Sequence, residues 1–140
     1  MKRLKRLRTH TLITAILFAT VLKTVGVAEP YTPSGAERKA ILDALREPVS
    51  RQLEQPVEFV VEKIAVSGEW AFVIATPQRP GGSQIAWQRT VCKGDVSHLV
   101  GGLIKRLADG WSVQALALCP TDVAWETWPG EYGAPAELLK

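Results

Sequence analysis

Two segments near the middle of the chain constrain its fold most, because their apolar residues recur at every second position. Residues 57–61 alternate in this way, residues 64–66 continue with the opposite parity, and residues 70–75 alternate again. A period of two is typical of half-buried strands, and a parity shift within a strand is typical of a β-bulge. Since Ser67-Gly68 favours a tight turn, the sequence predicts a β-hairpin with a bulge in its first strand.

A helix is predicted before this hairpin. Ser34-Gly35-Ala36-Glu37 matches the capping box S-x-x-E, in which the serine hydroxyl and the glutamate carboxylate bind backbone N–H groups of the first turn. Apolar residues within 40–45 form one face of this helix. Pro48 lacks a backbone N–H, so the helix should kink or stop near Glu47, with one or two further turns before Pro56.

The second half of the chain is predicted to add strands. Residues 84–92 form a third strand in this prediction, after a loop rich in proline and glycine. Residues 99–107 also fit helical spacing, but Gly101-Gly102 would destabilise a helix by about 2 kcal/mol. Because Asp109-Gly110 favours a hairpin turn into a strand at 111–118, we predict a strand over 99–107 and keep a helix as the alternative.

These elements predict an α+β fold. Strands joined in sequence by short turns form an antiparallel meander, and an amphipathic helix buries its apolar face on such a sheet. We therefore expect an N-terminal helix packed on a curved antiparallel β-meander of four to five strands. A short C-terminal helix at 122–128, ended by Pro129-Gly130, and an irregular tail complete the domain. The layout resembles cystatin-like or NTF2-like architecture, a likeness that does not fix function.

The N-terminus has the three parts of a secretory signal peptide. Lysines and arginines crowd positions 2–8, a mostly apolar run follows at 11–22, and Gly26-Val27-Ala28 supplies small residues for a signal peptidase. The run is shorter than the ~20 residues that cross a bilayer. We predict that residues 1–28 are removed as a signal peptide, which leaves one small domain at 29–140. An uncleaved inner-membrane anchor is the alternative.

Removal of this segment changes the charge of the protein. Six of the 17 lysines and arginines lie within residues 1–28 and all 14 acids lie after them, so the net charge falls from +3 to −3. A net negative domain gives no electrostatic reason to expect nucleic acid as a partner. Contact with a membrane is expected only through the signal segment before its cleavage.

Two cysteines, Cys92 and Cys119, remain in the mature part. In an oxidising compartment an even number of cysteines favours a disulfide, with two free thiols as the alternative. If both cysteines ended strands that flank a common neighbour, they would lie about 9.6 Å apart, beyond the ~7 Å that a disulfide spans between Cα atoms. The bridge therefore requires at least one cysteine outside the paired strands.

Four segments resemble a known family: residues 37–46 (ERKAILDALR), 56–61 (PVEFVV), 68–73 (GEWAFV) and 121–125 (TDVAW). The family is a set of small, exported, uncharacterised proteins of proteobacteria, and the resemblance covers most of the mature chain. The resemblance implies a periplasmic location, or secretion. No activity is known for the family, so no site residue is carried over from it.

The mature part contains none of the common catalytic or metal-binding motifs. It has no H-E-x-x-H, C-x-x-C or G-x-S-x-G pattern and no glycine-rich phosphate loop. His98 is its one histidine, and a lone histidine near the start of a strand is usually a surface residue. A zinc site is not expected from one histidine without a paired cysteine motif. We predict no catalytic residue, no metal and no cofactor.

Two features favour binding, and the first is the loop at 77–82. There Arg79 lies between two prolines, with Gln78 beside it. A guanidinium group suits bidentate contact with a carboxylate or phosphate, and the neighbouring glycines would let a ligand approach the backbone. The alternative is an ordinary connection that is rich in turn residues.

The second feature is a group of aromatic residues near the C-terminus. Trp125, Trp128 and Tyr132 lie in the last 16 residues, and the two tryptophans share one helix face at a spacing of three. Such rings are favoured at binding surfaces. The alternative is that they close one end of the core.

These observations favour a non-catalytic periplasmic binding or protein-interaction module, with an envelope protein or a small ligand as its partner. The alternative is a small enzyme that uses a carboxylate as acid or base in a cone-shaped pocket of the NTF2-like kind. It would need an inward-facing acid, and Asp43 lies off the apolar face of the predicted helix. Glu58 and Glu62 alternate away from Phe59. A passive structural role in the envelope is a third reading.

Overall fold

The computed structural model describes residues 26–94 and 97–140. All but the last three residues of the predicted signal peptide, residues 1–28, lie outside this part of the chain. Within the described ranges, no helix combines the length and the apolar character that crossing a membrane requires.

Four antiparallel strands form one sheet in the order β1-β2-β3-β4, which is the order of the sequence. One long helix precedes the sheet, and short helical segments follow it. This confirms the predicted α+β fold, with four strands. The elements are α1 (Gly35–Leu53), β1 (Glu58–Ser67), β2 (Trp70–Gln78), the 3-10 helix η1 (Trp87–Arg89), β3 (Val100–Leu107), β4 (Gly110–Leu118), α2 (Trp128–Tyr132) and the 3-10 helix η2 (Ala136–Leu139).

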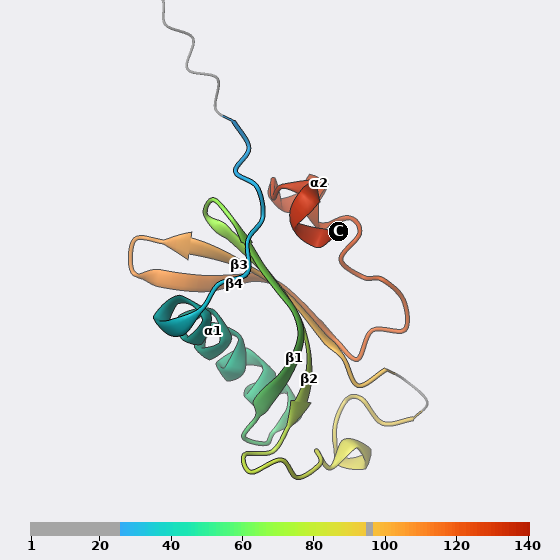
Figure 1. Ribbon diagram of the computed structural model, residues 1–140. Helices are drawn as coiled ribbons and strands as arrows, with labels where there is room; N and C mark the ends of the chain where they lie inside the picture. Colours follow the sequence, from blue (N-terminus) through green and yellow to red (C-terminus); the bar gives the residue numbers. More distant parts are fainter. Residues whose placement is uncertain (1–25, 95–96) are drawn as a thin grey trace, which may run out of the picture.

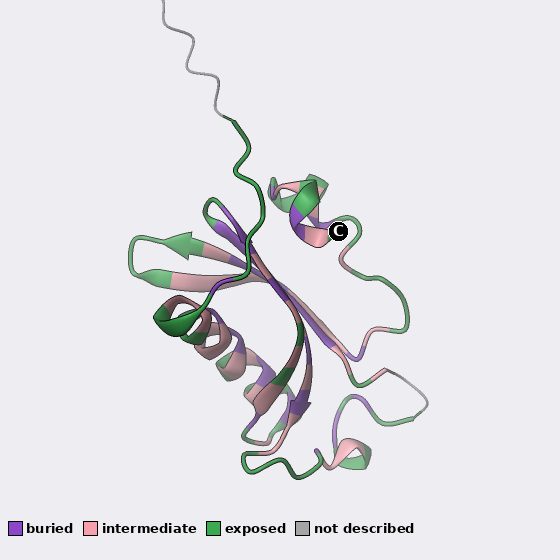
Figure 2. Ribbon diagram, in the orientation of Figure 1, coloured by how far each residue is buried: buried purple, intermediate pink, exposed green. Residues whose placement is uncertain are grey.

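The sheet is covered on both faces (Figure 1): α1 lies against one face, and the C-terminal segments with α2 and η2 lie against the other. The core therefore has two parts, and the buried residues follow the middle of the sheet and the inner sides of the covering elements (Figure 2). The larger part, beneath α1, includes Ile41, Leu45, Val49, Leu53, Val66, Val73 and Ile104. The smaller part includes Trp70, Phe72, Leu103, Trp128 and Leu138.

The start of α1 differs from the predicted capping box. The helix begins at Gly35 as expected, but the Ser34 side chain makes no capping hydrogen bond. The Glu37 carboxylate accepts hydrogen bonds from the Tyr31 hydroxyl, at 3.1 Å, and from the Arg106 guanidinium group. The capping box is therefore wrong, because partners distant in sequence bind the glutamate that was expected to reach back to the helix start.

Pro48 does not stop α1, which continues to Leu53. Ile41, Leu45, Val49 and Leu53 recur at a spacing of four and are all at most 1% exposed. This stripe packs on the sheet on both sides of the proline. The burial of the stripe outweighs the loss of one backbone hydrogen bond, so the predicted further turns join the first helix.

The two predicted hairpins are both present. In the β1–β2 hairpin the register shifts between Val61 and Lys63, which confirms the predicted bulge. Residues 100–107 form β3, so the strand prediction is confirmed over the helical alternative. The β3–β4 turn lies one residue earlier than predicted: Leu107 pairs with Gly110, and the turn residues are Ala108 and Asp109.

The predicted third strand at 84–92 is wrong. This segment contains only the short η1 helix and otherwise irregular chain. β2 already pairs with β1 along one edge and with β3 along the other. Since β2 and β3 pair directly with each other, residues 84–92 form the connection between them and not a further strand of the sheet.

A short C-terminal helix is present as predicted, but its predicted position at 122–128 is wrong, because α2 begins where that helix was expected to end. Pro129 lies in the first turn of α2, where a missing N–H costs no intrahelical hydrogen bond. Gly133, at φ +71°, ends the helix in the left-handed conformation that glycine adopts most easily. Pro129 was predicted to end a helix, and it lies at the start of one.

Candidate functional site

The connection between β2 and β3, residues 79–99, is the longest in the described chain, and we call it the β2–β3 loop. A disulfide between Cys92 and Cys119 ties it to the end of β4, with the two Cα atoms 5.7 Å apart. This distance is short enough because Cys92 lies in the loop and not at the end of a strand. The predicted bridge is confirmed, and it holds the middle of the loop against the sheet.

Two buried residues also anchor this loop. Ile85 is 4% exposed and packs in the core beneath α1. Thr90 is 8% exposed, and its hydroxyl donates to the carbonyl oxygen of Trp87 at 2.8 Å and accepts from the backbone N–H of Cys92 at 3.0 Å. The described part of the loop is thus held by apolar burial, by hydrogen bonds and by a covalent bond.

Arg79 stands at the beginning of the loop and binds the end of α1. Its Nε donates to Oε1 of Gln55 at 3.0 Å, and the backbone N–H of Ala86 donates to the same oxygen at 3.0 Å. The loop closes on itself, because the N–H of Arg79 donates to the carbonyl oxygen of Ser83 at 2.8 Å. Arg79 is half-buried and serves to join the loop to the helix.

Gln78 ends β2 and is held by a cross-strand partner. Its Nε2 donates to Oε1 of Glu58 at 2.8 Å, and these residues form the last pair of the β1–β2 hairpin. One step along the same face of β2, the Thr76 hydroxyl donates to Oε1 of Glu62 at 2.9 Å. Two carboxylates of β1 therefore fix two polar side chains of β2 where the loop begins.

A cavity of about 250 Å³ lies where the β2–β3 loop folds back on β2. Thr76 and Gln78 line it from the strand, and Gln84, Trp87 and His98 line it from the loop. The rings of Trp87 and His98 are stacked, with centroids 4.1 Å apart and planes 4° from parallel. Polar side chains and an aromatic pair therefore meet in one concave site, which we call the loop cavity.

Two further cavities are lined in part by residues of the β2–β3 loop. One, of about 460 Å³, shares Gln84, Trp87 and His98 with the loop cavity and extends to Arg89. The other, of about 210 Å³, is lined by Arg79 and Arg89 and also by Glu54, at the C-terminal end of α1. The carboxylate of Glu54 and the negative end of the helix dipole offset the two guanidinium charges there. Arg79 does not line the loop cavity, and its contact with an anion stays a prediction.

The predicted aromatic residues lie at another place in the fold (Figure 1): α2 and the β2–β3 loop are at opposite ends of the molecule. Trp128 is 7% exposed, and its ring centroid is 6.3 Å from that of Phe72. Trp125 is half-buried, with its centroid 5.8 Å from that of Phe72. Tyr132 is 41% exposed. The structure brings Arg79 and Gln78 together, and it places the two tryptophans in the smaller part of the core.

Trp87 and His98 were not among the predicted site residues. They are eleven positions apart in the sequence, so a stack of their rings leaves no periodic pattern. The available signal was their position on either side of Cys92, because a cysteine that anchors a long connection also fixes its neighbours.

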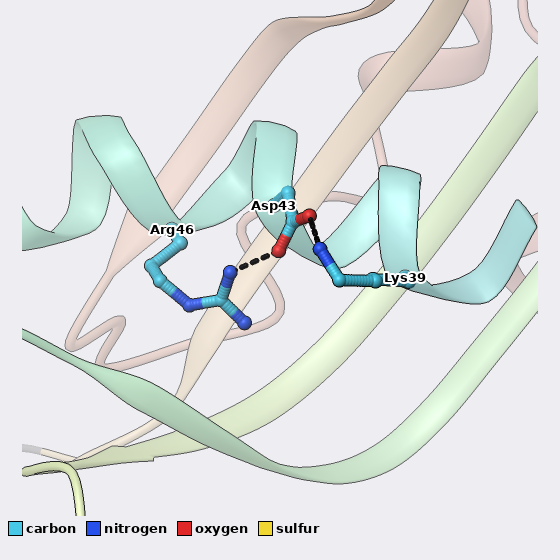
Figure 3. Close-up of polar contacts among 3 residues, drawn as sticks. All are labelled: Lys39, Asp43 and Arg46. Carbon is cyan, nitrogen blue, oxygen red and sulfur yellow. Dashed lines mark hydrogen bonds and ion pairs between the residues drawn. The ribbon is translucent and has the colours of Figure 1, made fainter. Parts of the chain in front are cut away.

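Among the described residues, two titratable groups have a shifted pKa: Asp43 on α1, and Tyr31 in the segment before α1. Asp43 accepts from Lys39 and Arg46 on the exposed side of α1 (Figure 3), and these hydrogen bonds hold the pKa of its carboxyl below the ordinary value. Burial and the neighbouring Glu37 carboxylate raise the pKa of the Tyr31 hydroxyl. Neither group lines the loop cavity, so both are parts of the scaffold.

Among the described residues, no group of three or more His, Cys, Asp and Glu side chains is placed to hold a metal ion. No protein-family model, curated protein or solved structure matches this chain. The candidate site therefore rests on its own geometry.

Proposed function

We propose that this protein is a non-catalytic binding module that works in the periplasm or outside the cell, after removal of residues 1–28. Its ligand site is the loop cavity. The observation that carries this proposal is the stacked Trp87–His98 pair beside Thr76, Gln78 and Gln84 in a loop that a disulfide ties down. A preformed concave site with few polar groups and an aromatic wall is typical of small-ligand binding.

The disulfide supports a location in an oxidising compartment. The export signature of residues 1–28 supports the same location and narrows it to the periplasm or the exterior. Contact with a membrane belongs to this segment before cleavage. The net charge of −3 after cleavage makes nucleic acid an unsuitable partner.

The packing beneath α1 favours binding at the loop over catalysis inside the sheet. An NTF2-like enzyme would hold its carboxylate between the helix and the concave sheet. Ile41, Leu45 and Val49 fill that space, and each is 0% exposed. Asp43 points away from it, toward Lys39 and Arg46 (Figure 3). A small ligand is therefore expected at the end of the domain, in the loop.

Native mass spectrometry of the protein purified from its own envelope tests this proposal. The wild-type protein should carry an added small-molecule mass, because a preformed site retains its ligand through gentle purification. The exposed residues Gln84 and His98 line the cavity, so a smaller fraction of Gln84→Ala and of His98→Ala should carry that mass, while both variants remain folded. Tyr132→Ala is the matched control and should keep it.

Two results would overturn the proposal. One is an added mass that survives both loop substitutions and disappears in Tyr132→Ala, which would place the ligand at the C-terminal aromatic group. The other is a wild-type protein that carries no added mass after purification at low salt and again after overnight exposure to its own envelope extract.

A further inference from the structure

The lining of the loop cavity indicates what kind of molecule it accepts. The described residues that line it include no Asp, Glu, Lys or Arg. Its polar side chains are the hydroxyl of Thr76 and the amides of Gln78 and Gln84, beside the His98 ring. A strongly charged ligand would have to leave water without a charge to balance it, at a large cost in free energy. The lining therefore suits an uncharged polar ligand.

Hydrogen bonds within the protein determine which atoms remain for a ligand. The Thr76 hydroxyl uses its proton on Glu62, so its oxygen is left as an acceptor. The Gln78 amide uses one of its two N–H groups on Glu58, so its other N–H and its carbonyl oxygen are left for a ligand. The exposed Gln84 amide offers a donor and an acceptor. A ligand must therefore donate as well as accept hydrogen bonds, which hydroxyl groups do and a carboxylate ion does not.

The stacked pair supplies an apolar surface in the same cavity. Trp87 and His98 lie parallel at 4.1 Å, and the exposed His98 continues the aromatic wall toward solvent. The C–H face of a sugar ring packs on such a wall through dispersion and weak C–H contacts. The neighbouring cavity of about 460 Å³ shares both rings. A chain of linked rings could therefore extend from one cavity into the other along the same wall.

We infer that the ligand of the loop cavity is a neutral carbohydrate, either a sugar or a short glycan, whose hydroxyl groups meet Thr76, Gln78 and Gln84 and whose ring packs on the Trp87–His98 pair. This inference rests on the proposed function and names its ligand. In this inference Thr76 and Gln78 accept hydrogen bonds from the ligand, and the carboxylates of Glu62 and Glu58 hold these two side chains in place.

Amide NMR of the exported protein, with its disulfide intact, tests the inference. The probes are chitotriose and maltotriose as neutral glycans, inorganic phosphate as an anion and acetyl-trialanine amide as a neutral peptide. At millimolar concentration, at least one glycan should shift the Trp87 indole signal and the His98 amide signal in a saturable way. Phosphate and the peptide should leave both signals in place.

Variants show whether the proposed contacts carry the affinity. Loss of one aromatic contact should weaken glycan binding about tenfold in Trp87→Ala. Because Trp87 is half-buried and its loss can disturb the fold, His98→Ala and Gln84→Ala serve as second variants, each expected to weaken binding severalfold. Tyr132→Ala should bind within about twofold of the wild-type protein.

The outcomes separate this inference from the proposed function. If phosphate or the peptide shifts the Trp87 and His98 signals and the glycans do not, the carbohydrate assignment is wrong and the binding site stands. If a glycan binds but shifts only signals near Tyr132, both are wrong. If neither glycan shifts any signal, the carbohydrate assignment is wrong. The proposed function is then tested separately, by whether the native mass spectrum shows an added small-molecule mass.

Discussion

Gly101 lies directly beneath the Trp125 ring, on the face of the sheet opposite α1. A Cβ atom on this residue would be 2.6 Å from Cε3 and 2.9 Å from Cζ3 of the tryptophan. Gly102 has the same relationship to Leu45 of α1, where a Cβ atom would be 2.7 Å from Cδ1. Adjacent residues of a strand face opposite sides, so this glycine pair lets β3 receive a large side chain closely on each face.

Gly101→Ala should destabilise the protein by about 1–3 kcal/mol, because the added methyl group must displace Trp125 from the core. Urea unfolding followed by tryptophan fluorescence measures the change. Gly130→Ala is the control, since a Cβ atom there meets nothing within 4 Å. Because Gly130 lies in the helix α2, this change should raise stability by up to about 1 kcal/mol. Equal effects of the two substitutions would contradict the close packing at Gly101.

The glycine pair also illustrates what the sequence can reveal. The pair correctly indicated that residues 99–107 do not form a helix, because the low helix propensity of glycine is a local property. It did not disclose Trp125 or Leu45 as partners, since those contacts depend on chain segments that are distant in sequence. The two hairpins were predictable for the same local reason: period-two patterns and turn residues act within a few positions.

The failures of prediction share a non-local cause. Residues 84–92 have a plausible strand pattern, but β2 and β3, which precede and follow them in the sequence, pair directly with each other. Pro48 is tolerated because the stripe of buried residues on α1 packs on both sides of it. At the site, Gln78 could be singled out from the sequence, whereas its neighbour Arg79 lines a different cavity. The Trp87–His98 stack could not, because the disulfide and the loop path create it.

Removal of the disulfide should cost about 3–4 kcal/mol of stability, since it closes a loop with a sequence separation of 27 residues. Cys92→Ser combined with Cys119→Ser makes this change without leaving a free thiol. Hydrogen exchange should show the larger loss of protection in the described part of the β2–β3 loop, and the smaller loss in the β1–β2 hairpin. A uniform loss over the whole domain would show that the bridge does not hold the loop in particular.

Arg79→Ala should cost about 1 kcal/mol, because it removes the hydrogen bond from Nε to Gln55. The exposed Arg89 lines the same small cavity and is the control, with an expected change within about 0.5 kcal/mol for Arg89→Ala. Thermal unfolding of the three proteins measures the difference. If Arg79→Ala were as mild as Arg89→Ala, Arg79 would have no structural role at the end of α1.

Asp43 should make the stability of α1 depend on acid pH. Its hydrogen bonds to Lys39 and Arg46 lower its pKa in the folded protein below the ordinary value of 3.8. The stabilisation is therefore fully present above 3.8 and is lost as the pH falls through the lowered value. The effect is small, because each of the three side chains is between 38% and 76% exposed to solvent, which screens the charges.

The comparison of wild type with Asp43→Asn reveals this dependence. The melting temperature of the wild-type protein should exceed that of the variant at neutral pH, and the two should converge in acid. Asp109→Asn, in the exposed turn between β3 and β4, controls for the general effect of removing a carboxylate. A difference that grows on acidification would mean that the Lys39–Asp43–Arg46 contacts do not stabilise the helix.

Photo-cross-linking in the living cell tests the central claim, that the loop cavity is the binding site, most directly. A photoreactive amino acid replaces the exposed Gln84 in one strain and the exposed Tyr132 in another. Replacement of Gln84 weakens binding only severalfold, so ligand is still present there to be captured. After irradiation, the mass of the purified protein shows whether a ligand has been attached. We predict an adduct at position 84 and none at position 132. An adduct confined to position 132, or none at either position, would contradict the assignment of this site.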